Sequence, residues 1–131
     1  MSSDVSGLAG EGARVWLIPD GYIPEQSTGE GRSHEAICVL NSSDADASLS
    51  IVFYFEDRDP IKGVSVIVPA ERTLHVRTDL PDHLGGVEVP RGIPYAVRVE
   101  SDVPVVVQHS RMDTSQEALA LMTTLAHPVV R

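Results

Sequence analysis

Closely spaced turn-forming residues constrain this chain more than any other feature. Proline, glycine, asparagine and aspartate interrupt the apolar runs at short intervals, which is typical of strands and excludes a fold built on long helices. The clearest interruptions are Pro19-Asp20-Gly21, Gly29-Glu30-Gly31, Asn41-Ser42-Ser43-Asp44, Asp57-Arg58-Asp59-Pro60, Pro69-Ala70, Pro81-Asp82, Pro90-Arg91-Gly92 and Asp102-Val103-Pro104.

The segment 48–56 carries the clearest strand pattern. Apolar and polar residues alternate along it, so one face of an extended chain is apolar and the other is polar. The apolar face holds Leu49, Ile51, Phe53 and Phe55, and the polar face holds Ser48, Ser50, Tyr54 and Glu56. The pattern predicts a strand with one side toward the core.

Six further segments predict strands: 15–18, 36–40, 64–68, 72–78, 95–100 and 105–110. The segment 116–126 combines helix-forming Glu-Ala-Leu-Ala with strand-forming Met-Thr-Thr-Leu, and we predict a strand there. Seven or eight strands without βαβ spacing predict an all-β fold, a single-domain antiparallel β-sandwich or jelly-roll-like barrel.

The chain has 131 residues, the usual size of one domain. Residues 1–13 are rich in small and polar residues and predict a flexible tail, with the β domain over 14–131. They have no basic start and no apolar h-region, so we expect no signal peptide, and no apolar run is long enough to span a membrane. Cys38 is the only cysteine, which fits a cytoplasmic location and a small core residue.

The formal net charge is −9, from 19 acidic and 10 basic residues. Such a surface repels phosphate backbones on average, so no nucleic-acid partner is expected.

A polar stripe is predicted on the strand 72–78. Leu74, Val76 and Thr78 share one face, while Thr73, His75 and Arg77 share the other. Either the stripe is a solvated sheet face, or His75 and Arg77 donate hydrogen bonds to a ligand.

A second polar cluster ends an apolar run. Val103-Pro104-Val105-Val106-Val107 predicts a strand buried on both faces, and Gln108-His109-Ser110-Arg111 follows it directly. Polar groups at the end of a buried strand are costly unless they pair with each other or with a ligand, so a pocket is favoured over simple exposure.

His34 and Glu35 enter the strand that carries Cys38, at a sheet end where sites are commonly built. Trp16 is the only tryptophan, and it is either a core residue or, if partly exposed, a stacking platform for a sugar or an apolar ligand.

The enzymatic patterns find little support. His109 and Ser110 are adjacent on an extended chain, so their side chains point to opposite faces and cannot form a nucleophile and base pair. No cofactor is expected. A metal-dependent, cupin-like enzyme that used His34, His75 and His109 with Glu35 stays as an alternative, although no ligand spacing supports it.

Four short motifs in order resemble the family of the soluble transducer of a cyanobacterial sensory rhodopsin. The matching segments are Trp16 with Gly21-Tyr22-Ile23-Pro24, then Ser33-His34-Glu35 with Cys38-Val39-Leu40-Asn41, then 68–73 with His75-Val76-Arg77, and last Val103-Pro104 with Gln108-His109-Ser110-Arg111 and Asp113. The resemblance covers nearly all of 14–127. It implies a β-sandwich protomer, a homotetramer and a binding or signalling role without catalysis.

The main functional expectation is therefore a non-catalytic module that binds a small polar ligand, such as a sugar or a related metabolite. An adaptor that binds a protein partner such as a sensory rhodopsin is the alternative. The predicted pocket residues are Trp16, His34, Glu35, Arg72, His75, Arg77, Gln108, His109 and Arg111.

Overall fold

The computed structural model describes residues 11–25, 33–113 and 120–130. Its elements are the strands β1 (Ala13–Gly21), β2 (His34–Asn41), β3 (Ala47–Tyr54), β4 (Ile61–Val68), β5 (Arg72–Arg77), β6 (Tyr95–Asp113), β7 (Ala120–Leu125) and β8 (His127–Val129), with one 3-10 helix, η1 (Pro81–Leu84). The predicted all-β fold is confirmed. Residues 1–10 of the predicted tail and the predicted loop at Gly29-Glu30-Gly31 lie outside the described residues.

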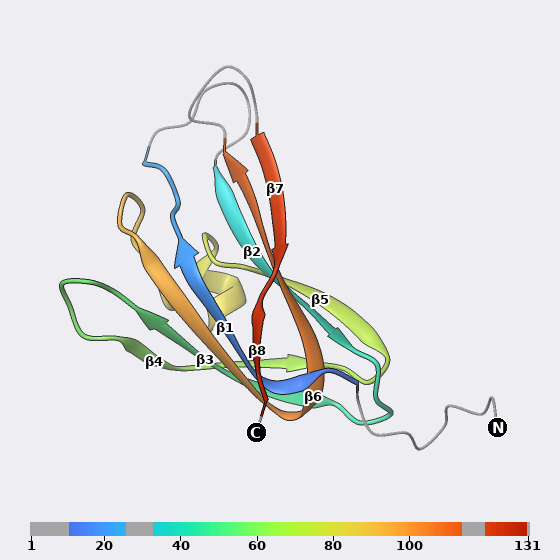
Figure 1. The fold of residues 1–131 in the computed structure, drawn as a ribbon. Coiled ribbons are helices and arrows are strands. Elements are labelled where there is room, and N and C mark those ends of the chain that lie inside the picture. The colour runs from blue at the N-terminus through green and yellow to red at the C-terminus, as the bar shows by residue number, and fades with distance from the viewer. Residues whose placement is uncertain (1–10, 26–32, 114–119, 131) are drawn as a thin grey trace.

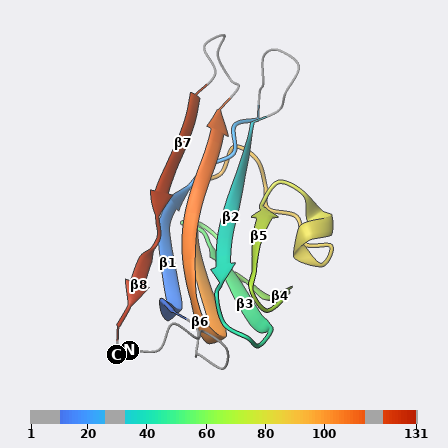
Figure 2. The same ribbon diagram turned by 90° about the vertical axis from the view of Figure 1, so that its right-hand side faces the viewer.

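The strands form two layers that share β6. Sheet A has the order β4-β3-β6-β1-β8, and sheet B has the order β5-β2-β6-β7. All pairings are antiparallel. In Figure 2 the strands of sheet B lie side by side in the foreground, with β3 and β4 behind them.

β6 combines two of the predicted strands, 95–100 and 105–110, into one strand that turns back on itself (Figure 1). Its first arm pairs with β1 and β3 as far as Ser101, and its second arm pairs with β2 and β7 from Val106 onward. The predicted strand break at 102–104 is wrong, because the chain bends there without leaving the extended conformation. Proline has no backbone N–H to donate, and Pro104 fits the bend because the described ladders of β6 do not pair it with any residue.

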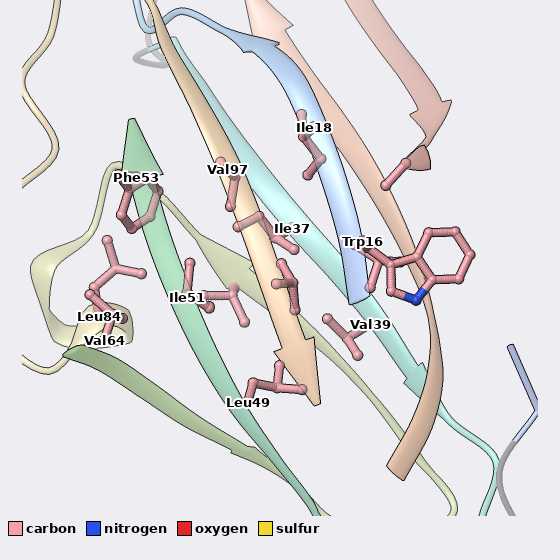
Figure 3. Close-up of a cluster of buried hydrophobic side chains, with 14 of the residues drawn as sticks. Trp16, Ile18, Ile37, Val39, Leu49, Ile51, Phe53, Val64, Leu84 and Val97 are labelled. Atoms are coloured by element: carbon pink, nitrogen blue, oxygen red, sulfur yellow. The ribbon is translucent and has the colours of Figure 1, made fainter. Parts of the chain in front are cut away.

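Alternation along each strand fills the space between the sheets. The expected inner residues of β3, Leu49, Ile51 and Phe53, are buried. They pack with Ile37 and Val39 of β2 and with Val97 of β6 (Figure 3). A fully buried side chain of this kind contributes about 1.5–3 kcal/mol to stability, so this contact between sheets is the main source of cohesion.

Trp16 belongs to this core. It is 4% exposed, and its indole Nε1 donates to the carbonyl oxygens of Ala13 and Val105, each at 2.9 Å. The second bond ties β1 to the bend of β6. Of the two readings of the lone tryptophan, the structure supports the core residue.

The second arm of β6 is buried on one face only. Val105 and Val107 point inward and are fully buried, whereas Val106 is half-buried and Gln108 is exposed. The expectation of burial on both faces is wrong, because no described segment covers the outer face of sheet B at Gln108.

The helix η1 covers the side of the sandwich between β4 and β5, which it contacts (Figure 2). Its Leu84 inserts into the core with 1% exposure. Among the described residues, no helix is long and apolar enough to cross a membrane.

The ambiguous C-terminal segment is a strand where it is described. β7 begins at Ala120, and residues 116–119 of the predicted strand lie outside the described part of the chain.

Candidate functional site

A buried carboxylate lies at the centre of the candidate site. Alternation along β2 places Glu35 on the inner face of sheet B with Ile37 and Val39, and Glu35 is 0% exposed. A carboxylate at such a position is costly unless charges and donors surround it.

Four groups meet the Glu35 carboxylate. Tyr95 donates its hydroxyl to Oε1, and Arg111 donates Nε to Oε2 at 2.5 Å. The backbone N–H of Tyr22 donates to both oxygens, at 3.2 and 3.1 Å. His109 Nε2 lies 3.3 Å from Oε1 in an orientation that makes no hydrogen bond. We call Glu35, Tyr95, His109 and Arg111 the Glu35 cluster.

The Glu35 cluster joins segments that are far apart in the sequence. Tyr95 begins the first arm of β6, while His109 and Arg111 belong to its second arm, so one carboxylate holds both arms. Thr78 Oγ1 lies 2.9 Å from the Tyr95 hydroxyl, and Thr78 N donates to the backbone carbonyl of Glu35. The cluster therefore also fixes the end of β5.

Gly21 allows this close approach. A Cβ atom at Gly21 would lie 2.5 Å from Tyr95 Cζ and 2.9 Å from Glu35 Oε1, closer than real Cβ contacts. Any side chain there would push the ring or the carboxylate away, so the last residue of β1 has to be glycine for the cluster to close.

The cluster favours the ionised form of Glu35. Burial alone would raise its pKa, but contacts from His109, Tyr95 and the Tyr22 N–H outweigh burial and lower the pKa of Glu35 below its usual value. Burial and the neighbouring Glu35 charge raise the pKa of Tyr95, which keeps its hydroxyl protonated as a donor.

The structure separates the predicted pocket residues by sheet face. Glu35, His109 and Arg111 converge on the inner face, as described above. His75 pairs across the ladder with Cys38, and Cys38 pairs with Gln108, so these side chains share the outer face. His34 and Arg77 also belong to the outer face by register. The two groups lie on opposite sides of sheet B.

The remaining two predicted residues lie elsewhere. Trp16 is in the core, and Arg72 is exposed at the start of β5, where its guanidinium donates to the carbonyl of Glu71. Neither contacts the Glu35 cluster through a described hydrogen bond or ion pair.

A second ion-pair group surrounds Asp79. Arg77 donates Nε and Nη2 to the two Asp79 oxygens at 2.7 Å each, and Arg91 Nη2 lies 3.7 Å from Oδ2. Burial opposes ionisation of Asp79, but Arg77 outweighs it and lowers the pKa of this carboxyl. Arg77 is thus occupied by a neighbouring residue of its own chain.

The described residues offer little for catalysis. His109 points inward and Ser110 points outward, where its hydroxyl lies 3.7 Å from Cys38 Sγ. Among the residues that the structure describes, no group of three or more His, Cys, Asp or Glu side chains could hold a metal ion. The metal-enzyme alternative needs His34, His75 and His109 to meet at Glu35, but the register puts His34 and His75 on the outer face of sheet B and His109 and Glu35 on the inner face.

A cleft opens beside the Glu35 cluster, between β1 and the chain from β7 to β8. Its volume is about 470 Å³, within the range of small-ligand sites. His109, Arg111 and Asp20 are among its lining residues, and Arg111 Nη2 lies 3.8 Å from Asp20 Oδ2. The other lining residues are Ile18, Pro19, Met122, Thr124, Leu125, Ala126, His127 and Pro128.

Tyr95, Thr78, Asp79 and Gly21 are site positions that the sequence pattern does not indicate. The pattern places Gly21 in a turn and Tyr95 at the start of a strand. An inward Glu35 between apolar neighbours was the one available signal, because a buried carboxylate requires donors from other strands.

Replacing Glu35 by glutamine tests the cluster. Because the folded pKa of Glu35 is lowered, its contribution to stability is present above the ordinary pKa of about 4.5 and is lost as the pH falls through the folded value. At neutral pH Glu35→Gln should cost about 3 kcal/mol, since it leaves Arg111 without its partner, and it should flatten the acid limb in urea titrations at several pH values. The exposed Glu88→Gln serves as control, and equal losses in both variants would contradict the assignment.

Comparison with known proteins agrees with the sequence motifs. The family profile described as Anabaena sensory rhodopsin transducer matches residues 11–128. No curated protein matches the chain. The crystal structure of Thermotoga maritima 1070 is 39% identical with a TM-score of 0.79, over 90% of this chain and 96% of that chain. The structure of the Anabaena sensory rhodopsin transducer is 40% identical with a TM-score of 0.70, over 81% of this chain and 92% of that chain. The chain belongs to the Anabaena sensory rhodopsin transducer family.

Proposed function

We propose that this protein is a non-catalytic signalling adaptor that binds a membrane receptor of the sensory rhodopsin class. The observation that carries the proposal is the 40% identity with the Anabaena sensory rhodopsin transducer over 81% of this chain. In the Glu35 cluster Tyr95 and Arg111 donate to one buried carboxylate, which supports a structural role for these groups over a catalytic one.

Charge supports a receptor as the partner. The net charge of −9 complements the excess of lysine and arginine that membrane proteins carry on their cytoplasmic loops. Complementary charge raises the association rate and orients the encounter. The adaptor would therefore act in the cytoplasm, at the inner surface of the membrane.

We further propose that the adaptor works as a homo-oligomer, a tetramer in the family pattern, joined through the outer face of sheet B. Leu40, Leu121 and Leu125 share that face by register and are 47%, 68% and 63% exposed. Apolar side chains gathered on one sheet face are typical of an interface.

A small polar ligand in the cleft is the second candidate function. The observation that favours it is the cleft of about 470 Å³, whose lining combines Asp20, His109 and Arg111. Among the described lining residues there is no Phe, Tyr or Trp. A sugar or related metabolite would thus be held by Asp20, His109 and Arg111 instead of by ring stacking.

Receptor binding is tested with the Anabaena sensory rhodopsin in detergent, the receptor after which the 40% identical transducer is named. The tagged full-length protein should retain the receptor at low salt, detected by the visible absorption of its retinal, and release it as the salt concentration rises. An unrelated β-sandwich domain of similar negative charge is the control. Absence of retention at low salt would contradict the adaptor function.

Light scattering tests the oligomer. The wild-type protein should have a mass well above the 14.1 kDa of one chain, and Leu40→Glu should shift it toward the monomer because a charge enters the interface. Ile67→Glu, an equally exposed apolar position on β4, should leave the mass unchanged. A monomeric wild-type protein would contradict the proposal.

Thermal unfolding with sugars and small organic acids tests the ligand. A ligand at 100 times its dissociation constant should add about 2.7 kcal/mol of stability. His109→Ala should remove this increment, while Gln108→Ala on the opposite face should keep it. If no compound raises the midpoint, the second candidate loses its support.

A further inference from the structure

Two open strand edges flank the cleft beside Arg111. β8 pairs with β1 only at Val15, Trp16 and Leu17, so beyond Leu17 the described part of β1 has a ladder on its β6 side alone. Within the described residues β7 pairs with β6 and with no other strand. Unpaired backbone N–H and C=O groups therefore border the cleft on both sides.

β7 lacks the usual protection of an edge strand. Natural edges carry charged residues, proline or bulges that discourage pairing with another chain. The five residues from Leu121 to Leu125 are all exposed, and none is charged or a proline. Such an edge is suited to accept another extended segment.

The charges around the cleft favour a cation. Arg111 is engaged by the buried Glu35 at 2.5 Å, whereas Asp20 lies 3.8 Å from the same guanidinium and its side chain is 75% exposed. The carboxylates of Glu35 and Asp20 carry two negative charges, and the Arg111 guanidinium neutralises one of them. Asp20 is the exposed carboxylate, so a side chain that enters the cleft can reach it.

We propose that an extended, basic segment of the partner protein adds as a strand along β7 and places a lysine or arginine side chain in the cleft beside Asp20. By register Met122 and Thr124 share the cleft side of β7 with His109 and Arg111, while Leu121 and Leu125 point to the outer face, with Leu125 also bordering the cleft. The added strand would therefore alternate basic residues toward the cleft with apolar residues outward. The proposal rests on the adaptor function and names the chemistry of the partner.

The test uses the full-length protein and a fluorescent peptide of alternating lysine and valine, with binding followed by anisotropy. We expect saturable binding that Asp20→Asn weakens about threefold to fivefold, the size of a partly exposed ion pair. Thr124→Lys should abolish it, because the new ammonium group takes the place of the incoming one. Asp59→Asn, in an exposed loop far along the chain, should leave the affinity unchanged.

Two matched peptides separate charge from strand addition. A glutamate and valine peptide should not bind, and equal binding would overturn the basic specificity. A lysine and valine peptide methylated on alternate backbone nitrogens should lose its affinity, since methylation removes the donors that pair with β7. Unchanged affinity of the methylated peptide would overturn the strand addition.

The receptor assay distinguishes this inference from the adaptor function. If the wild-type protein and Thr124→Lys retain the sensory rhodopsin equally, the site is overturned while the adaptor function stands. If the lysine peptide binds as expected but no receptor is retained, the site stands and the adaptor function is overturned.

Discussion

The ionised carboxylate of Glu35, held away from water, is the constraint on which the rest of this sandwich depends. Its charge is tolerated because donors arrive from the end of β1 and from both arms of β6. Each donor comes from a different part of the chain, so the electrostatic requirement of one side chain fixes the relative positions of distant strands. The apolar core supplies most of the stabilisation, and the Glu35 cluster ties the end of β1 and both arms of β6 to β2.

The same requirement creates the surface that the proposed function uses. Arg111 has to reach inward to Glu35, and it also lines a cleft together with Asp20. The outer face of sheet B lies on the opposite side of the sheet from the Glu35 cluster. It carries His75, Gln108 and exposed leucines. One sheet thus carries a polar inner end around Glu35 and a broad outer face where polar side chains and exposed leucines are mixed.

The strands could be predicted because period-2 alternation is a local property of the sequence, as the segment 48–56 illustrates. Membership of the family followed from short motifs. The division of the polar residues could not be predicted, since His75 and Gln108 face away from Glu35 only through the ladder register, a nonlocal property. The roles of Tyr95 and Gly21 could not be predicted for the same reason, because both arise from contact with Glu35 on another strand.

The turn in β6 also sets the order in which the protein can be completed during synthesis. Both sheets use β6 as an interior strand, so the β1 and β3 ladders of sheet A cannot form before residues 95–105 have left the ribosome, and the β2 ladder of sheet B cannot form before residues 106–112 have. Before residue 95 is made, β1 lacks every partner strand that the structure describes for it, and only the β3 with β4 and β2 with β5 ladders can exist. Contacts of such long sequence separation slow folding, and the nascent chain exposes its unpaired strands for most of its synthesis.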